Sequence, residues 1–335
     1  MAANNTMNRS AENMSISVIL CTYNRCQSLR RALESVAASR MPENAVWKIV
    51  VVDNNSSDAT PSVVREFEAK HPGRFRYIFE SKPGKSNALN RGIADTNAEV
   101  LAFMDDDVIV DPDWLWNLTK IFEDEKYVGS GGVILPETNF KQPKWLDTSY
   151  RYSLAPLAMF DLGPKSGELR EPPFGTNMAF RREVFRRFGV FRCDLGPHPD
   201  SEIRGEDTEF GMRVLQGGGR LWYEPAAVVH HEIPQKRLKP AYFLKWWFDK
   251  GRSEVRENGS RHGTRWVVAN VPLSLFRRVL VWTARWMLTF QSAPRFTARL
   301  RVWQHCGAMT EYRSLARSRI GADSPAAGVA TGQQQ

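Results

Sequence analysis

The chain has 335 residues, 42% of them hydrophobic and 25% charged, which is the composition of an ordinary globular protein. Its four cysteines form no CxxC pair and are too few for a secreted disulfide scaffold, so we expect free thiols and a cytoplasmic location. Residues 1–14 lack the apolar core of a signal peptide, and no run of about 18 uncharged apolar residues predicts a transmembrane helix.

The positive charge of the chain is concentrated in its last third. Of the formal net charge of +9, residues 236–320 contribute +14, from 18 Lys and Arg against 4 Asp and Glu, which leaves −5 for the remainder. We therefore expect four parts: a disordered tail over 1–14, an α/β domain over 15–235, a basic, Trp-rich helical extension over 236–320, and a second disordered tail over 321–335.

Strands and helices alternate along the first third of the chain. Such short alternating units predict βαβ repeats and a parallel sheet. Thr22, Asp53 and the triplet Asp105-Asp106-Asp107 each follow a strand, so they should lie along one edge of the sheet, where open α/β sheets bind ligands. The expected strands cover 16–20, 49–52, 75–79 and 99–104, and the expected helices cover 28–39, 60–69 and a segment that begins at Gly84.

The middle of the chain is less regular. Two histidines, His230 and His231, directly follow its last expected strand. Because adjacent strand side chains point to opposite faces, only one of them can face a site, and we prefer His230. The expected elements are a strand over 128–135, a loop region over 136–173, helices over 183–188 and 205–216, and strands over 221–223 and 227–229.

The acid triplet is the most unusual local feature. Three adjacent carboxylates at a strand end repel one another, and a divalent cation removes that cost. Oxygen ligands suit Mg²⁺ or Mn²⁺, so the triplet predicts a metal site. The alternative is a solvated acidic turn or a helix cap, because Asp111-Pro112-Asp113 is typical of a helix start.

The order of these motifs resembles that of glycosyltransferase family 2, the nucleotide-sugar-dependent enzymes with a GT-A fold. The resemblance implies a GT-A (Rossmann-like) mixed, mostly parallel sheet flanked by helices and followed by a C-terminal helical extension. It also implies an inverting, metal-dependent reaction. The matching segments lie within about residues 16–231 and are Val18–Arg25 (VILCTYNR), Val51–Asp58 (VVDNNSSD), Gly84–Asn90 (GKSNALN), the acid triplet and Gly205–Asp207 (GED).

The resemblance also assigns roles to acids and a histidine. It implies that Asp107 binds the metal and that Asp105 contacts ribose or a metal-bound water, while Asp106 leaves a one-residue ambiguity. It implies that Asp207 is the catalytic base and Glu206 a supporting residue near the acceptor; the alternative for Asp207 is a helix cap in a first turn. A histidine near residue 230 would be a further metal ligand.

Further residues near the strand ends suit a nucleotide. Asp53 can accept hydrogen bonds from a pyrimidine N–H or a ribose hydroxyl, or it can start an Asx-type turn. Thr22 and Tyr23 would line the same pocket, with Tyr23 either stacking there or buried in the core. Lys85, at a helix start, can meet phosphate together with free backbone N–H groups, or it is an ordinary surface lysine.

The basic C-terminal region is also rich in tryptophan. Six of the eleven tryptophans lie between Trp246 and Trp303. We expect an amphipathic helix around 243–250 and another over 271–290, which should lie along an anionic membrane surface because arginines interrupt it. In this interpretation Trp282 and Trp286 contact the lipid. The alternative is a helical extension packed on the first domain; nucleic-acid binding is not favoured, because no nucleic-acid motif accompanies the charge.

Three functions follow from these features. The first is a metal-dependent inverting glycosyltransferase that moves a sugar to a hydroxyl of a saccharide or lipid-linked acceptor, in cell-surface polysaccharide or glycolipid synthesis at the inner face of the membrane. The second is a nucleotidyltransferase, which would need a stronger phosphate loop than Gly84-Lys85-Ser86. The third is a non-catalytic membrane- or nucleic-acid-binding module, which would have no need for Asp53, Asp107 and Asp207 together.

Overall fold

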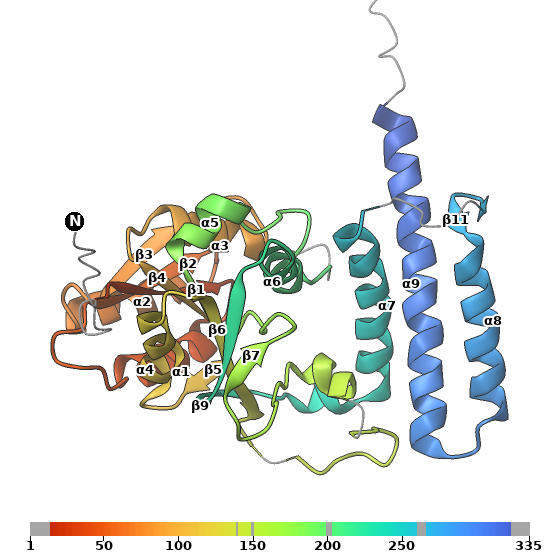
Figure 1. The fold of residues 1–335 in the computed structure, drawn as a ribbon, viewed down its shortest axis with the longest axis horizontal. Helices are drawn as coiled ribbons and strands as arrows, with labels where there is room; N and C mark the ends of the chain where they lie inside the picture. The colour runs from red at the N-terminus through yellow and green to blue at the C-terminus, as the bar shows by residue number, and fades with distance from the viewer. Residues whose placement is uncertain (1–13, 139, 149–150, 199–202, 260–265, 323–335) are drawn as a thin grey trace, which may run out of the picture.

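The structure, a computed structural model, describes residues 14–138, 140–148, 151–198, 203–259 and 266–322. The tail expected over 1–14 lies outside these residues apart from Met14, and the tail expected over 321–335 lies outside them apart from residues 321 and 322. Figure 1 shows an α/β body built on a central sheet, with three long C-terminal helices standing beside it.

The central sheet is mixed and mostly parallel, as predicted. Its strands are β1 (Ile16–Thr22), β2 (Trp47–Asp53), β3 (Phe75–Phe79), β4 (Val100–Asp105), β5 (Val108–Val110), β6 (Tyr127–Pro136), β7 (Gly167–Leu169), β8 (Met178–Arg181) and β9 (Arg220–His231). In the described part of the chain their order is β3-β2-β1-β4-β8-β6-β9-β5, with β7 paired to β9. The pairings make β1, β2, β3, β4, β6 and β9 run one way, and β5, β7 and β8 the other.

Helices cover the sheet because each buries one apolar face. In the first of them Leu29, Leu33 and Val36 recur at helical spacing and are fully buried. The helices of the body are α1 (Cys26–Ala37), α2 (Thr60–Lys70), α3 (Lys85–Ala94), α4 (Trp114–Thr119), α5 (Arg182–Phe188) and α6 (Glu206–Gln216), with short 3₁₀ segments η2 (Lys120–Glu123), η3 (Arg151–Leu157) and η4 (Gln235–Leu238).

The strand register brings the polar signatures to one level. Thr22 at the end of β1 lies opposite Asp53 at the end of β2, and Cys21 lies opposite Asp105 at the end of β4. Since all three strands are parallel, their carboxyl ends meet at one edge. The prediction that these motifs share an edge is therefore confirmed.

Two local expectations were wrong, and one strand was not expected. The strands expected over 221–223 and 227–229 form one strand, β9. Residues 225–227 of β9 are inserted relative to β6, because Gly132 lies opposite Glu224 and the next residue, Val133, lies opposite Val228. The region 136–173 is not only a loop, because it contains η3 and β7. The segment after the acid triplet contributes β5, which pairs with the end of β9.

The C-terminal helices are α7 (Pro240–Glu257), α8 (Leu273–Leu288) and α9 (Ser292–Ala322), with a small hairpin of β10 (Val267–Val268) and β11 (Val271–Pro272) before α8. Helix α7 packs on the body through Phe243 and Trp247, which share a buried cluster with Leu157 and, on α9, Leu300. The wholly buried carboxylate of Glu311 on α9 accepts hydrogen bonds from two α7 arginines. Helices α7 and α9 are thus packed into the protein, as the second interpretation of this region expected.

Candidate active site

A cavity of about 1330 Å³ opens at the carboxyl ends of β1 and β4. It extends from the acid triplet to the start of α6 and on to α7 and α9, so the body and the C-terminal helices both form its walls. Among the expected site residues, those that line it are Thr22, Tyr23, Lys85, Asp105, Asp106, Asp107, Glu206, Asp207 and His231. Asp53 and His230 are not among its lining residues.

Asp105 is paired with the lysine at the start of α3. The Lys85 Nζ atom lies 2.5 Å from Asp105 Oδ1 and 3.6 Å from Glu206 Oε1. Burial alone would raise the pKa of Asp105. The charge and hydrogen bond of Lys85, followed by the charges of His231 and Arg25, together outweigh burial and hold that pKa below its usual value. Lys85 therefore joins the acids at the end of β4 to the acids at the start of α6.

The first turn of α3 does not present all its backbone N–H groups, contrary to expectation. The N–H of Lys85 donates to the carbonyl of Pro197 at 2.9 Å. That group is therefore already hydrogen-bonded, and an incoming phosphate would have to meet the ammonium of Lys85 instead.

Asp106 is the buried member of the triplet. Its Oδ2 accepts a hydrogen bond from Thr22 Oγ1 at 2.7 Å, and its Oδ1 accepts one from Arg25 Nη1 at 3.0 Å. Burial, followed by the negative charges of Asp107 and Asp105, raises the pKa of Asp106 to about 6 despite Arg25. Asp106 thus fixes the acid-bearing turn to the end of β1.

Asp107 projects among cations and a histidine. Arg25 Nη1 lies 3.1 Å from its Oδ2, Arg237 Nη2 lies 3.5 Å from the same atom, and His231 Nε2 lies 3.5 Å from its Oδ1. The preference for His230 was wrong, because β9 pairs Val108 with His231 and turns that ring toward the acids. His230 points to the other face, where its Nε2 lies 2.9 Å from Asp111 Oδ1.

The donor set around Asp107 is suited to a partial metal shell. Among the described residues, no group of three or more His, Cys, Asp and Glu side chains converges as a complete metal site. Mg²⁺ typically binds one or two carboxylates and completes its shell with water and substrate phosphates. Burial lowers the pKa of His231, which favours the neutral imidazole that ligates metals. Asp107 and His231 therefore fit a divalent ion that shares its other ligands with a bound diphosphate.

Asp53 is buried at the end of β2 and is already engaged. It accepts hydrogen bonds from Tyr77 Oη and from the Ser56 N–H, both at 2.8 Å. The bond to Ser56, three residues on, resembles that of an Asx-type turn. A carboxylate has further lone pairs, so these bonds orient Asp53 and leave it able to accept more hydrogen bonds.

Tyr23 is 44% exposed, so the alternative that placed it in the core was wrong.

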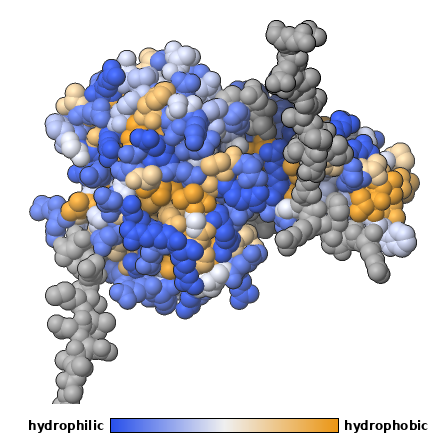
Figure 2. Space-filling model, turned by 90° about the horizontal axis from the view of Figure 1, so that it is seen from above, coloured by the Kyte–Doolittle hydropathy of each residue, from blue (hydrophilic) through white to orange (hydrophobic). Residues whose placement is uncertain are grey.

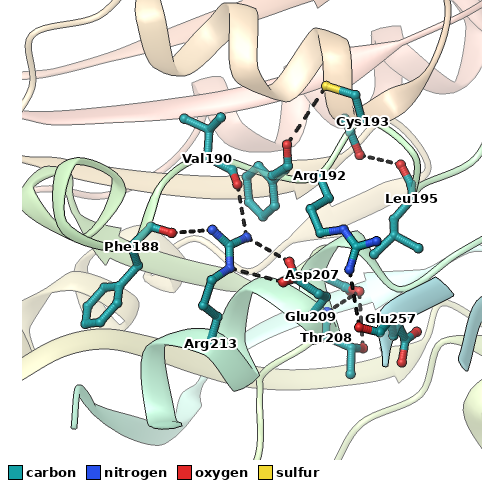
Figure 3. A network of polar contacts seen from close by, with 12 residues as sticks. Phe188, Val190, Arg192, Cys193, Leu195, Asp207, Thr208, Glu209, Arg213 and Glu257 are labelled. Carbon is teal, nitrogen blue, oxygen red and sulfur yellow. Dashed lines mark hydrogen bonds and ion pairs between the residues drawn. The ribbon is translucent and has the colours of Figure 1, made fainter. Parts of the chain in front are cut away.

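Asp207 lies in the first turn of α6 and accepts hydrogen bonds on both oxygens. Its Oδ2 accepts from the Gly175 N–H and its Oδ1 from the Thr208 N–H, each at 2.7 Å. A Cβ atom on Gly175 would lie 3.0 Å from Asp207 Oδ2, so a glycine suits this close approach. In the described part of the chain Asp207 forms no ion pair, whereas Glu209 on the same helix is paired with Arg213 (Figure 3).

Figure 3 also shows how the start of α6 is held. Arg213 bridges Glu209 to the backbone carbonyls of Phe188 and Val190, and Arg192 donates to the Glu257 carbonyl of α7 at 3.2 Å. These contacts fasten α6 to the end of α5 and the loop after it, and they fasten that loop to α7. The position of Asp207 therefore depends on elements that are far apart in the sequence.

Glu206 is a second acid at the start of α6. It is 4% exposed, and burial together with the charge of Asp207 raises its pKa to about 7, although Lys85 opposes this. A carboxyl group in this state holds its proton part of the time at neutral pH. It lines the cavity beside Asp207.

Several cavity residues were missed by the sequence analysis. Arg25 ends the VILCTYNR segment, and nothing in that segment predicted its contacts with Asp106 and Asp107. Arg237 follows the predicted domain boundary at residue 235 and gave no local signal for its contact with Asp107, 130 positions earlier. Gly175 carried no sign of its bond to Asp207. The wall from α7 and α9 includes Trp246, Trp247, Lys250, Arg301 and Gln304.

This fold, with acids at the end of β4 and a carboxylate at the start of α6 lining one cavity, is that of a GT-A glycosyltransferase. The sequence pattern described as "Glycosyl transferase family 2" matches residues 17–189, more than half of the chain. The chain belongs to glycosyl transferase family 2. Membership in this family decides for an enzyme and against the nucleotidyltransferase and the non-catalytic module.

Relatives of the chain agree with this assignment. It is 28% identical to the succinoglycan biosynthesis protein ExoM of Rhizobium meliloti over 307 residues, which cover 89% of this chain and 93% of that protein. It is 25% identical to the glucosyl-dolichyl phosphate glucuronosyltransferase of Haloferax volcanii over 245 residues, 72% of this chain and 76% of that one.

A solved structure has the same fold. The mannosyltransferase PcManGT from Pyrobaculum calidifontis, in complex with GDP-Man and Mn²⁺, superposes with a TM-score of 0.56 over 93% of this chain and 76% of its own. At 20% sequence identity, this likeness shows the fold alone.

Proposed function

We propose that the protein transfers a sugar, with inversion, from a nucleoside-diphosphate sugar to a hydroxyl of a saccharide or lipid-linked acceptor in cell-surface polysaccharide or glycolipid synthesis. One observation carries the proposal: Asp207, which forms no ion pair among the described residues, lines the same cavity as the acid triplet. A donor and an acceptor bound together in this cavity would thus meet both a proton acceptor, Asp207, and the acids proposed to lie near the diphosphate. The biosynthetic role of ExoM supports the choice of pathway.

The donor nucleotide is assigned to the strand ends. Thr22 and Tyr23 would line its pocket, and Asp53 would accept from a pyrimidine N–H or ribose hydroxyl. Asp105 would contact ribose or a metal-bound water. Lys85 has three ammonium protons and only two carboxylate neighbours, so it can also meet a phosphate oxygen.

The diphosphate side is assigned to Mg²⁺ or Mn²⁺. Asp107 and His231 would hold the ion, and Asp106 would fix the turn that carries Asp107. When bound, the ion supplies Lewis-acid neutralisation of the charge on the leaving diphosphate. The Mn²⁺ in the mannosyltransferase complex supports this choice of cofactor.

The acceptor side is assigned to the start of α6. Asp207 takes the proton of the acceptor hydroxyl while its oxygen bonds to the anomeric carbon and the bond to the diphosphate oxygen breaks. Attack from the face opposite the leaving group inverts the anomeric centre. The N–H groups of Gly175 and Thr208 hold the carboxylate of Asp207 in place, and Glu206 would orient the acceptor beside it.

We further propose that the enzyme works at the inner face of the cell membrane, attached through α8. No helix in the described residues is both long and apolar enough to cross a bilayer, so attachment would be to its surface. The tryptophans expected to touch lipid are both half-buried: Trp286 packs on Trp303 with ring centroids 6.2 Å apart, and Trp282 lines a cavity among the C-terminal helices. We therefore assign the lipid contact to the exposed apolar residues of α8.

A donor screen tests the proposed reaction. Nucleotide sugars are offered one at a time, with Mn²⁺ or with EDTA, and both thermal stabilisation and slow hydrolysis of the donor are measured. The proposal expects one nucleotide-sugar class to stabilise the protein and to be hydrolysed only with the metal. Hydrolysis at the same rate in EDTA would contradict the metal role.

A further inference from the structure

A second cavity, of about 650 Å³, lies among the three C-terminal helices. Helix α7 contributes Glu254 and Val255, α8 contributes Leu275, Arg278 and Trp282, and α9 contributes residues from 297 to 312. Glu254, Arg301 and Gln304 line this cavity and also the active-site cavity. The two cavities are therefore separated by one shared wall, and a molecule in the second contacts the residues that enclose the first.

The second cavity is lined by more positive than negative charge. Arg278, Arg301 and His305 face it, and Glu254 is its carboxylate. Glu254 is already held by the Gln304 amide, with N–O distances of 2.8 and 2.9 Å. In the described residues Arg278 has no hydrogen-bond or ion-pair partner, although it lies at the cavity.

His305 reports the same electrostatic environment. Its burial, followed by the charges of Arg278 and Arg301, lowers the pKa of its imidazole to about 4. Two guanidinium groups thus lie close enough to repel a proton from the ring. An anion in this cavity would meet two cations and a neutral imidazole that can donate a hydrogen bond.

The outer face of α8 is apolar. Leu280, Val281, Met287 and Leu288 are 58% to 75% exposed and follow one another at helical spacing on one stripe of the helix. Figure 2 shows hydrophobic side chains gathered at the edge of the molecule where α8 lies. Arg277 lies on the same exposed face, and Arg278 follows it at the cavity. The helix thus presents apolar residues outward and a cation toward the second cavity.

We propose that the second cavity binds the phosphate of an anionic phospholipid head group while the α8 stripe of Leu280, Val281, Met287 and Leu288 rests in the bilayer surface. The proposal rests on the membrane attachment proposed above and deepens it by naming the lipid chemistry. Arg278, which has no hydrogen-bond or ion-pair partner among the described residues, provides charge complementarity for a phosphate group. The apolar stripe on the same helix selects a lipid over a free anion, because it accommodates acyl chains.

The shared wall links this site to the active-site cavity. A head group held by Arg278 and His305 would touch Arg301, whose guanidinium also stacks on Trp247 at 5.0 Å in the active-site wall. A bound head group would therefore contact a residue that also lines the active-site cavity.

The test compares two neighbouring arginines. Arg277→Gln and Arg278→Gln remove the same charge from adjacent positions of α8, and only Arg278 lines the cavity. Co-sedimentation with phosphatidylglycerol/phosphatidylcholine vesicles is measured for the full chain. Loss of one surface charge should weaken binding about five-fold in Arg277→Gln, and loss of a direct charge-assisted contact should weaken it on the order of fifty-fold in Arg278→Gln.

Three outcomes decide between the alternatives. Equal weakening by both variants would leave membrane attachment standing and refute the head-group site. No binding of the wild type to anionic vesicles would refute both, while donor hydrolysis would still report on the transferase function separately. Displacement of vesicles by millimolar inorganic phosphate at constant ionic strength would show that the cavity takes free phosphate, and would overturn the lipid assignment.

A second variant tests the stripe itself. Leu280→Ser with Leu288→Ser removes apolar area without changing charge, on side chains that are 70% and 75% exposed and contribute little to folding. This double variant should lose the salt-resistant part of vesicle binding while keeping its binding to short-chain soluble phosphatidylglycerol. Loss of binding to the soluble lipid as well would contradict the separate roles of cavity and stripe.

Discussion

Replacing Asp207 by asparagine should remove transfer while leaving the donor bound. Both oxygens of Asp207 accept an N–H, from Gly175 at 2.7 Å and from Thr208 at 2.7 Å. Asparagine keeps one acceptor oxygen and puts an amide NH₂ group opposite the other N–H. The variant therefore loses the proton acceptor and one backbone contact at the same time.

The two losses have different magnitudes and different readouts. Leaving one partly buried N–H unpaired costs about 1–3 kcal/mol of folding free energy. Removing a general base lowers kcat by a factor of about 10² to 10⁴. Because Thr22, Tyr23 and Asp107 are unchanged, the affinity for donor and Mn²⁺ should stay within about two-fold of wild type on this reasoning.

Asp58→Asn is the matched control. Asp58 also accepts two backbone N–H groups, from Cys26 at 2.9 Å and Thr60 at 3.0 Å, and it does not line the cavity. Both variants should lose similar stability in urea unfolding, and only Asp207→Asn should lose transfer with the donor that the screen identifies. A folded Asp207→Asn protein with wild-type kcat would show that Asp207 is a helix cap and that the base lies elsewhere.

Three further predictions follow from the site. A nucleoside diphosphate should raise the thermal midpoint in Mn²⁺ and not in EDTA, and His231→Ala should reduce that gain while His230→Ala does not. Burial would raise the pKa of Asp58, but hydrogen bonds from Thr60 and Cys26 outweigh it and lower that pKa to about 2. The stabilisation that Asp58 supplies is therefore complete above pH 3.8 and is lost as the pH falls toward 2, so acid unfolding of Asp58→Asn should lack this component. Gly205 and Gly218 flank α6 with φ of +97° and +84°, but only a Cβ on Gly205 would strike Glu257, so Gly205→Ala should lower transfer and Gly218→Ala should not.

The sequence was sufficient to predict the strands and the polar motifs of the parallel half of the sheet. There, each apolar strand is followed directly by its polar motif, and β3 over 75–79 was predicted to the residue. The edge shared by Thr22, Asp53 and Asp105 follows from parallel pairing alone. These features are local, so a single sequence carries them.

The rest depended on long-range pairing. Strand alternation showed that only one of His230 and His231 can face the acids. Which of the two does so depends on the pairing of β9 with β5, and no local sequence pattern predicts that pairing. Helix α9 has a weak periodicity because α7 and α8 pack on it from two sides, so it was not anticipated as a separate helix. Arg237 contacts Asp107 because η4 follows the end of β9, which pairs with β5 directly after the acid triplet.

The predicted boundary at residue 235, between the α/β domain and the basic extension, does not separate the active site from the C-terminal helices. Ser253 Oγ of α7 accepts the Arg204 N–H at 2.9 Å, immediately before the turn that starts α6. The Glu257 carboxylate of α7 fills the space beside Gly205, where a Cβ would lie 2.0 Å from its Oε1, and Lys250 anchors that carboxylate at 3.0 Å. Since Asp207 lies two residues after Gly205, the helix that follows the α/β body fixes the residue proposed to take the proton. A chain shortened before α7 would keep the acid triplet, which is proposed to bind the donor, and would lose the contacts that support α6 and Asp207. Such a chain should therefore lose sugar transfer more than it loses donor binding.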